Sequence, residues 1–136
     1  MNAHHQNGIA ECKIRTLQEL TRTMLVHANK RWPKAITTNL WPYAMQMAND
    51  VLNETPHMQD VSKRRAQQIF SKTLVQTNLK HWKPFGCPVC VLDRNLQAGT
   101  AIFHKWKQRS KVGVYLGRSP QHARSCLLYT SDAADE

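Results

Sequence analysis

The stretch that decides the first part of the fold is QNGIAECKIRTLQELTRTML, residues 6–25. Small and apolar side chains recur in it at every third or fourth position, which is the spacing of one face of an α-helix. Asn7 is suited to cap the start of this helix, and Pro33 cannot continue it. We therefore expect a helix over residues 8–29. Its apolar stripe consists of Ala10, Ile14, Leu17, Thr21, Met24 and Ala28.

The following segments predict more helix and then short strands. LWPYAMQMANDVLNETP predicts a helix over about 38–54, because Pro42 falls in its first turn, where no N–H partner is needed. A shorter helix is expected over about 62–71. FGCPVCVLD and SKVGVYLGR are rich in Val and bounded by Pro or Gly, which predicts strands near 87–93 and 111–117. The buried stripe expected for the second helix is Trp41, Ala44, Met45, Ala48, Val51 and Leu52.

This order of elements predicts an α+β protein with helices before about residue 79 and a small β unit after it. The polar segment 94–109 between the strands is expected to be a loop. No apolar run approaches 18 residues, so no membrane-spanning segment is expected. The polar, His-rich start lacks a secretory signal, and four cysteines in 136 residues are typical of an intracellular, reduced protein.

The charge of the chain is its strongest compositional feature. Nineteen Lys and Arg face nine Asp and Glu, which gives a formal net charge of +10. The excess is spread along the sequence, which is typical of proteins that bind nucleic acid. The alternative is a basic surface that only contacts solvent.

One polar stripe on the first predicted helix combines an acid with cations. Glu11, Arg15, Gln18 and Arg22 are spaced i, i+4, i+7 and i+11, so they lie along one side. They can form an ordinary solvated face with an ion pair one turn apart. They can also place a carboxylate for a hard metal ion beside cations that hold phosphates. Spacing alone favours the solvated face.

The CPVC segment raises the question of zinc or redox chemistry. Zinc needs two further ligands at close spacing, and neither His81 nor the pair His4 and His5 lies in register with a second cysteine pair. In a strand, residues i and i+3 point to opposite faces. We therefore interpret Cys87 and Cys90 as buried strand cysteines.

Aromatic residues in the second half alternate with lysines. Bases can stack on aromatic rings while cations hold the backbone, or the rings can fill a small β core. The core interpretation is preferred for Phe85 and Tyr115, whereas the lysines stay candidates for phosphate contacts. The full set is Trp82, Phe85, Trp106 and Tyr115 with Lys80, Lys83, Lys105, Lys107 and Lys111.

Four sequence blocks, in order, resemble the integrase region of copia-type retrotransposon polyproteins. QNGIAECKIRTLQELTRTML is similar to the segment with Asn-Gly, two small or apolar residues and the last catalytic acid, followed by an Ile-Arg-Thr-rich helix. LWPYAMQMANDVLNETP resembles the next block, a Trp-Ala-rich helix that ends in Asn-x-Thr-Pro. FGCPVCVLD and SKVGVYLGRSPQHARS resemble the β unit after the catalytic core. Together the blocks cover residues 4–125.

The resemblance implies the end of an RNase H-like integrase core at 1–78 and part of an SH3-like domain at 79–125. It implies Mg²⁺-dependent DNA strand transfer, with Mn²⁺ as a substitute, and Glu11 as the third catalytic carboxylate and metal ligand. It also implies element ends and target DNA as partners, a homo-oligomeric parent, and a nuclear or cytoplasmic-particle location. Candidate DNA-binding residues are Lys13, Arg15, Gln18, Arg22, Lys105, Lys107 and Lys111.

The chain also departs from the family pattern. Cys12 stands where an Arg usually follows the Glu, and the two catalytic aspartates belong upstream of this sequence. Asp50, Asp60 and Asp93 follow Glu11 and are in the wrong order to replace them. We therefore expect no catalysis by this chain alone. The alternative to an integrase segment is a stand-alone basic nucleic-acid-binding module without catalysis.

The last segment, CLLYTSDAADE (residues 126–136), resembles the translation of a transposase-based sequencing adapter. Without its three acids the formal net charge rises from +10 to +13. If this tail is foreign, the β unit is cut at Ser125 and leaves an unpaired strand edge. We expect the tail to make few contacts and the chain to be poorly stable.

Overall fold

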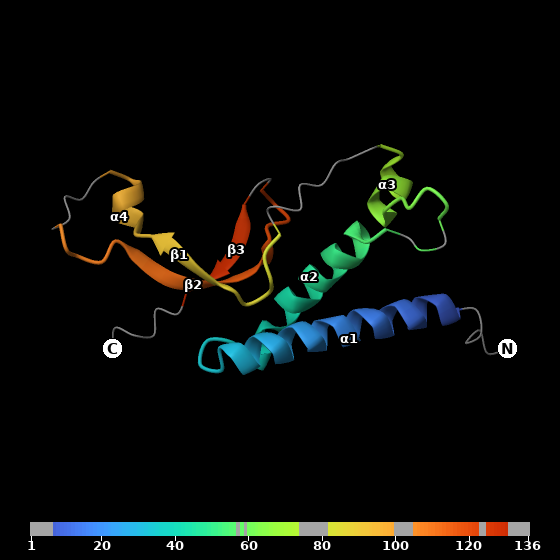
Figure 1. Cartoon of the computed structure of the whole chain (residues 1–136), viewed down its shortest axis with the longest axis horizontal. Helices are drawn as coiled ribbons and strands as arrows, with labels where there is room; N and C mark the ends of the chain where they lie inside the picture. The colour runs from blue at the N-terminus through green and yellow to red at the C-terminus, as the bar shows by residue number, and fades with distance from the viewer. Residues whose placement is uncertain are drawn as a thin grey trace.

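The computed structural model describes residues 7–56, 58, 60–73, 82–99, 105–122 and 125–130. Helices and strands are mixed, which confirms the predicted α+β class (Figure 1). The helical elements are α1 (Gly8–Arg31), the 3₁₀ turn η2 (Thr38–Leu40), α2 (Trp41–Glu54), α3 (Ala66–Ser71) and α4 (Arg94–Gln97). The strands are β1 (Pro88–Leu92), β2 (Ser110–Arg118) and β3 (Cys126–Tyr129).

The C-terminal half of α1 packs on α2, while its N-terminal half extends past it (Figure 1). Thr21 and Ala28 are the buried residues of α1, and Ala44 of α2 is fully buried. These small side chains let the two helix backbones approach closely. The buried hydroxyl of Thr21 donates a hydrogen bond to the Leu17 carbonyl at 2.7 Å, so its burial leaves no donor unsatisfied.

The apolar stripe predicted for α2 is only partly correct. Ala44 and Ala48 are fully buried, but Trp41 is 53% exposed. Trp41 directly follows η2, and Leu40 at the end of that turn takes the core position instead, with 6% exposure. Met47, which the stripe did not include, is also buried.

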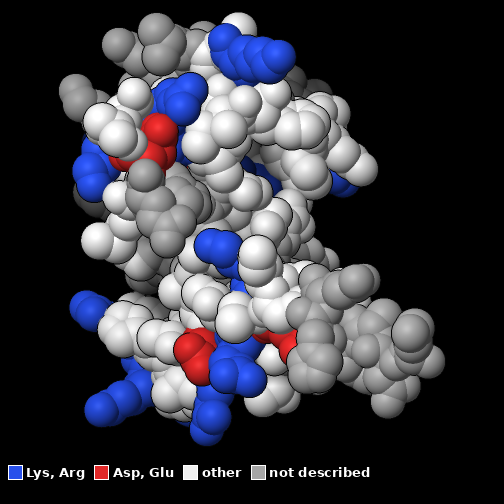
Figure 2. All heavy atoms as spheres, turned by 90° about the vertical axis from the view of Figure 1, so that its right-hand side faces the viewer, with Lys and Arg blue, Asp and Glu red and all other residues white. Residues whose placement is uncertain are grey.

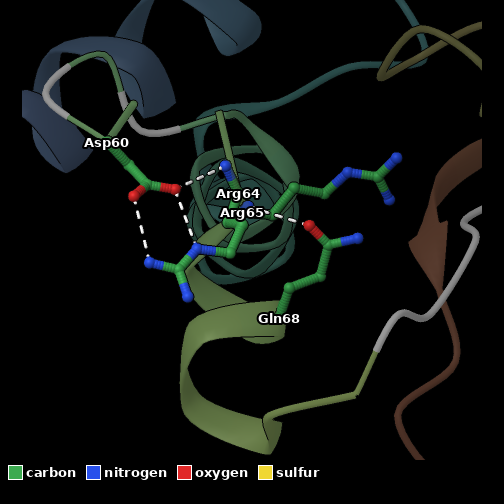
Figure 3. Close-up of polar contacts among 4 residues, drawn as sticks. All are labelled: Asp60, Arg64, Arg65 and Gln68. Carbon is green, nitrogen blue, oxygen red and sulfur yellow. Dashed lines mark hydrogen bonds and ion pairs between the residues drawn. The ribbon is translucent and has the colours of Figure 1, made fainter. Parts of the chain in front are cut away.

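The third helix begins at Ala66, four residues later than predicted. Figure 3 shows the reason: the Asp60 carboxylate accepts hydrogen bonds from the backbone N–H of Arg64 at 2.8 Å and from its guanidinium at 3.0 Å. These bonds, the side-chain ones most of all, lower the pKa of the Asp60 carboxyl to about 2. The Gln68 side chain then accepts from the Arg65 N–H at 3.1 Å and caps the helix.

The segment 94–109, predicted to be a loop, begins instead with the short helix α4. The Asp93 carboxylate caps this helix, because it accepts a hydrogen bond from the Asn95 N–H at 2.9 Å. A single turn of this kind is too short to give a periodic pattern in the sequence.

The three strands form an antiparallel sheet in the order β1-β2-β3. β1 pairs with β2 from Pro88↔Val114 to Leu92↔Ser110. β2 pairs with β3 from Val114↔Tyr129 to Arg118↔Cys126, with an irregularity between Tyr115 and Gly117. The prediction that the tail makes few contacts is therefore wrong for residues 126–129, which pair with β2. β2 is the central strand, and β1 and β3 are the edge strands of the sheet. The prediction for residues 131–136 lies outside the described residues.

Helices and sheet share one hydrophobic core. It joins Ile36 and Leu40 to residues of the β unit, and α2 lies directly on β2. At Gly86 the segment before β1 packs closely against α1, because a Cβ at this position would lie 2.6 Å from the Cβ of Ala28. The domain boundary near residue 79 stays a prediction. The buried core consists of Ala28, Ile36, Leu40, Ala44, Met47, Phe85, Val114, Tyr115 and Leu116.

Candidate nucleic-acid interface

The stripe on α1 presents one carboxylate and two guanidinium groups to solvent. Glu11, Arg15, Gln18 and Arg22 are all exposed. At a rise of about 1.5 Å per residue the stripe is roughly 16 Å long, which spans several phosphates of a DNA strand. Glu11 stands in the first turn, where the helix dipole favours a negative charge.

Lys13 does not share this stripe. It follows Glu11 by two residues and lies roughly 200° around the helix from it. Its side chain is exposed, so it is available for a contact, but on the other side of α1. The candidate DNA-binding residues of α1 therefore form two faces.

A metal site built from the described residues alone does not fit. Mg²⁺ takes about six oxygen ligands. Among the residues that the structure describes, no three His, Cys, Asp or Glu side chains lie close enough together to hold a metal ion. Glu11 can therefore be no more than one ligand of such a site.

The second group of candidates lies around the start of β2. Lys105, Lys107 and Lys111 are exposed. Trp106 is 85% exposed, and the Lys105 ammonium lies 5.5 Å from its ring centroid. Figure 1 places this segment and the N-terminal half of α1 at opposite ends of the long axis. The structure therefore does not bring the predicted DNA-binding residues together in one patch. The candidate phosphate contact at position 80 lies outside the described residues.

Among the charged side chains at the end of the molecule that faces the viewer in Figure 2, basic ones exceed acidic ones. Lys and Arg are spread over this face, and the few Asp and Glu side chains lie beside basic ones. This distribution suits a polyanion that is held at many points.

An acidic and basic cluster that the sequence did not reveal joins α2, α3 and β2. Glu54 pairs with Arg65 at 2.9 Å and with Arg118 at 4.0 Å. The Arg118 guanidinium in turn lies 5.6 Å from the Trp82 ring centroid. A cavity of about 620 Å³ opens beside this cluster. Burial raises the pKa of Asp50 in its wall, an effect that Arg118 opposes and Glu54 adds to.

The cluster carried no signal in the sequence because its members are far apart in the chain. Arg65 follows Glu54 by eleven residues, and Arg118 lies at the end of β2. Its geometry ties three elements together, which is a structural role. The Glu54 and Arg65 side chains are only 10% and 22% exposed, so removing one of them would leave the other charge largely buried without its partner. Arg118 is 49% exposed and 4.0 Å away, so its pair with Glu54 contributes less.

The cysteine interpretation is partly wrong. Cys87 is half-buried, but Cys90 is exposed on β1. Cys90 pairs with Val112, which is also exposed, so that face of the sheet is open at this position. Phe85 and Tyr115 are core residues as predicted, with 6% and 3% exposure.

One known protein is similar to almost the whole chain. The Retrovirus-related Pol polyprotein from transposon RE2 of Arabidopsis thaliana is 31% identical over 133 residues, which cover 92% of this chain. The similarity supports the interpretation that this chain is part of a retrotransposon polyprotein. The chain spans 8% of the length of that polyprotein. No protein-family model matches the chain, and no solved structure matches it.

None of the helices in the described part of the chain is both long and apolar enough to cross a membrane. The longest, α1, has 24 residues and carries charged side chains throughout.

Proposed function

We propose that the chain is the part of a copia-type integrase region that follows the first two catalytic aspartates. Two observations support this proposal: the four sequence blocks stand in the order of the family, and the polyprotein from transposon RE2 is similar over 92% of the chain. The parent activity would be Mg²⁺-dependent transfer of element DNA into host DNA. The helices would close an RNase H-like core, and the sheet would belong to an SH3-like domain.

The observation that carries the proposal is the placement of Glu11. It stands in the first turn of a helix whose opposite side is packed from Leu17 onward, and Arg15 follows it one turn later on the same exposed side. A carboxylate that binds a catalytic metal ion has to be accessible to it, and the neighbouring guanidinium could hold a phosphate of the DNA. In the parent enzyme Glu11 would be one ligand of Mg²⁺ or Mn²⁺, together with the two upstream aspartates.

DNA would be held through its phosphates by the α1 stripe and by the lysines near β2. A net charge of +10 favours binding through counterion release, which is independent of sequence. The parent would act as a homo-oligomer on element ends and target DNA, in the nucleus or in a cytoplasmic particle.

The test of DNA binding is the salt dependence of duplex binding by fluorescence anisotropy. Arg15→Ala should weaken binding to all sequences alike and lower the salt slope by about one unit. Lys72→Asn is the control, because it also removes one charge, at a left-handed position with φ of 55° that Asn tolerates. An affinity that does not depend on salt, or a strong preference for one sequence, would contradict the proposal.

Catalysis tests the role of Glu11. We expect no 3′-end processing or strand transfer by this chain alone with Mg²⁺ or Mn²⁺, because Glu11 is one ligand of a site that needs several. The assay uses a labelled duplex with an element end. Metal-dependent cleavage that survives purification and disappears in Glu11→Gln would show that the site is complete without the upstream aspartates.

A further inference from the structure

A small groove separates the last turns of α1 from the segment that leads into β1. Its volume is about 290 Å³, near the lower end for ligand sites in proteins. This size suits one planar ring system better than a folded peptide. The lining residues are His27, Ala28, Arg31, Trp32, Pro84, Phe85, Gly86, Cys87 and Pro88.

The walls of this groove are fixed by the core. Gly86, with φ of 77°, lies so close to Ala28 that a Cβ would come within 2.6 Å of the Ala28 Cβ. Its N–H donates to the Tyr115 carbonyl at 2.9 Å, and the Tyr115 N–H donates to the Cys87 carbonyl at 2.9 Å. The groove is therefore preformed, which lowers the entropy cost of binding a ligand.

The chemistry of the groove combines an exposed aromatic ring with cations. Trp32 is 40% exposed, Arg31 is exposed, and none of the lining residues is acidic. Lys83 is exposed and directly precedes the lining residue Pro84, so it adds a second positive charge beside the groove. An aromatic platform between cations is the arrangement that binds single-stranded nucleic acid.

On α1 the groove residues His27 and Arg31 lie roughly 160° and 200° around the helix from Glu11, on the side of Lys13. The groove is therefore a surface separate from the stripe of Glu11, Arg15, Gln18 and Arg22.

We propose that this groove binds one unpaired base of a single-stranded nucleic acid, which stacks on Trp32 while Arg31 and Lys83 hold the flanking phosphates. The inference rests on the proposed function, because it assumes that the chain binds nucleic acid. It adds a site that distinguishes unpaired bases from a bare phosphate backbone.

The experiment compares two single-stranded ligands of equal length and charge by fluorescence anisotropy. One is oligo-dT, and the other is an abasic strand with the same number of phosphates. The wild-type chain should prefer oligo-dT by about five-fold or more, the effect of one stacked base. Trp32→Ala should remove this preference, and Arg31→Ala should weaken both ligands alike.

Trp41→Ala is the matched control. Trp41 is also an exposed tryptophan, with 53% exposure, and it does not line the groove. It should keep the wild-type preference. If Trp32→Ala fails to fold by circular dichroism, Trp32→Leu keeps an apolar side chain without the ring and should lose the same preference.

The outcomes separate this inference from the proposed function. Equal binding of oligo-dT and the abasic strand by the wild-type chain overturns the base site and leaves DNA binding intact. A preference that persists in Trp32→Ala or Trp32→Leu, or one lost equally in Trp41→Ala, also overturns the site. Absence of binding to either single strand overturns the site, whereas the proposed DNA binding is decided separately by the salt titration with duplex DNA.

Discussion

Replacing Gly86 by Ala should destabilise the chain more than any other single-methyl change at a glycine. Gly86 has φ of 77°, a conformation that costs a residue with a side chain about 1–2 kcal/mol. The new methyl would also lie 2.6 Å from the Ala28 Cβ, which is rigid helix and cannot move away cheaply. Overpacking of this kind costs about 1–3 kcal/mol. Together the two effects give roughly 2–5 kcal/mol, a large part of the stability of a small domain.

The assay is urea unfolding followed by tryptophan fluorescence, and Gly99→Ala is the control. Gly99 has a similar φ of 68°, but among the described residues, its chain neighbours aside, no atom lies within 4 Å of the place that its new methyl group would take. Its substitution therefore carries only the backbone strain, partly offset by a lower entropy of the unfolded chain. The difference between the two variants isolates the contact with Ala28. Equal unfolding midpoints would refute the packing of the Gly86 loop on α1.

Burial and pairing lead to three further predictions. Asp50→Asn should raise the melting temperature at pH 7. Burial raises the pKa of the Asp50 carboxyl in the folded chain above its usual 3.8, so its ionised form disfavours folding at neutral pH. This penalty is lost as the pH falls through the folded pKa. A lower melting temperature would show that Asp50 mainly pairs with Arg118. Deleting residues 126–136 should lower the urea midpoint, because it uncovers the edge of β2; an unchanged midpoint would show that β3 adds nothing. Since Ile9 and Ile14 are 82% and 54% exposed, the wild-type chain should melt broadly and associate as its concentration rises; a sharp, monomeric transition in light scattering and calorimetry would contradict this.

The periodic elements were predictable from the sequence. The predicted helices 8–29 and 38–54 correspond to α1 and to η2 with α2, because three- and four-residue spacing over several turns specifies one buried face. The strands predicted at 87–93 and 111–117 correspond to β1 and β2. Exposure of the α1 stripe was predictable for the same reason as its helix, since polar residues at these spacings share one side.

Contacts between distant segments were not predictable. β3 forms from CLLY, which is too short and irregular to stand out, and it exists because β2 offers an edge. The cluster of Glu54, Arg65 and Arg118 depends on how α2, α3 and β2 meet. The groove at Trp32 likewise requires the loop at Gly86 to return to α1. None of these has a periodic signature along the chain.

The packing of α1 bears directly on what Glu11 can do. Its buried residues are Thr21 and Ala28, so the core fixes the C-terminal half, while Ile9 and Ile14 leave the apolar side of the first turns largely uncovered. Catalytic ligands have to be held within about 0.5 Å of their working position, and helical turns without tertiary burial are only marginally stable. A surface that covers these two isoleucines would therefore do two things at once. It would bury the uncovered apolar side of the first turns of α1, and it would fix the turn from which Glu11 projects.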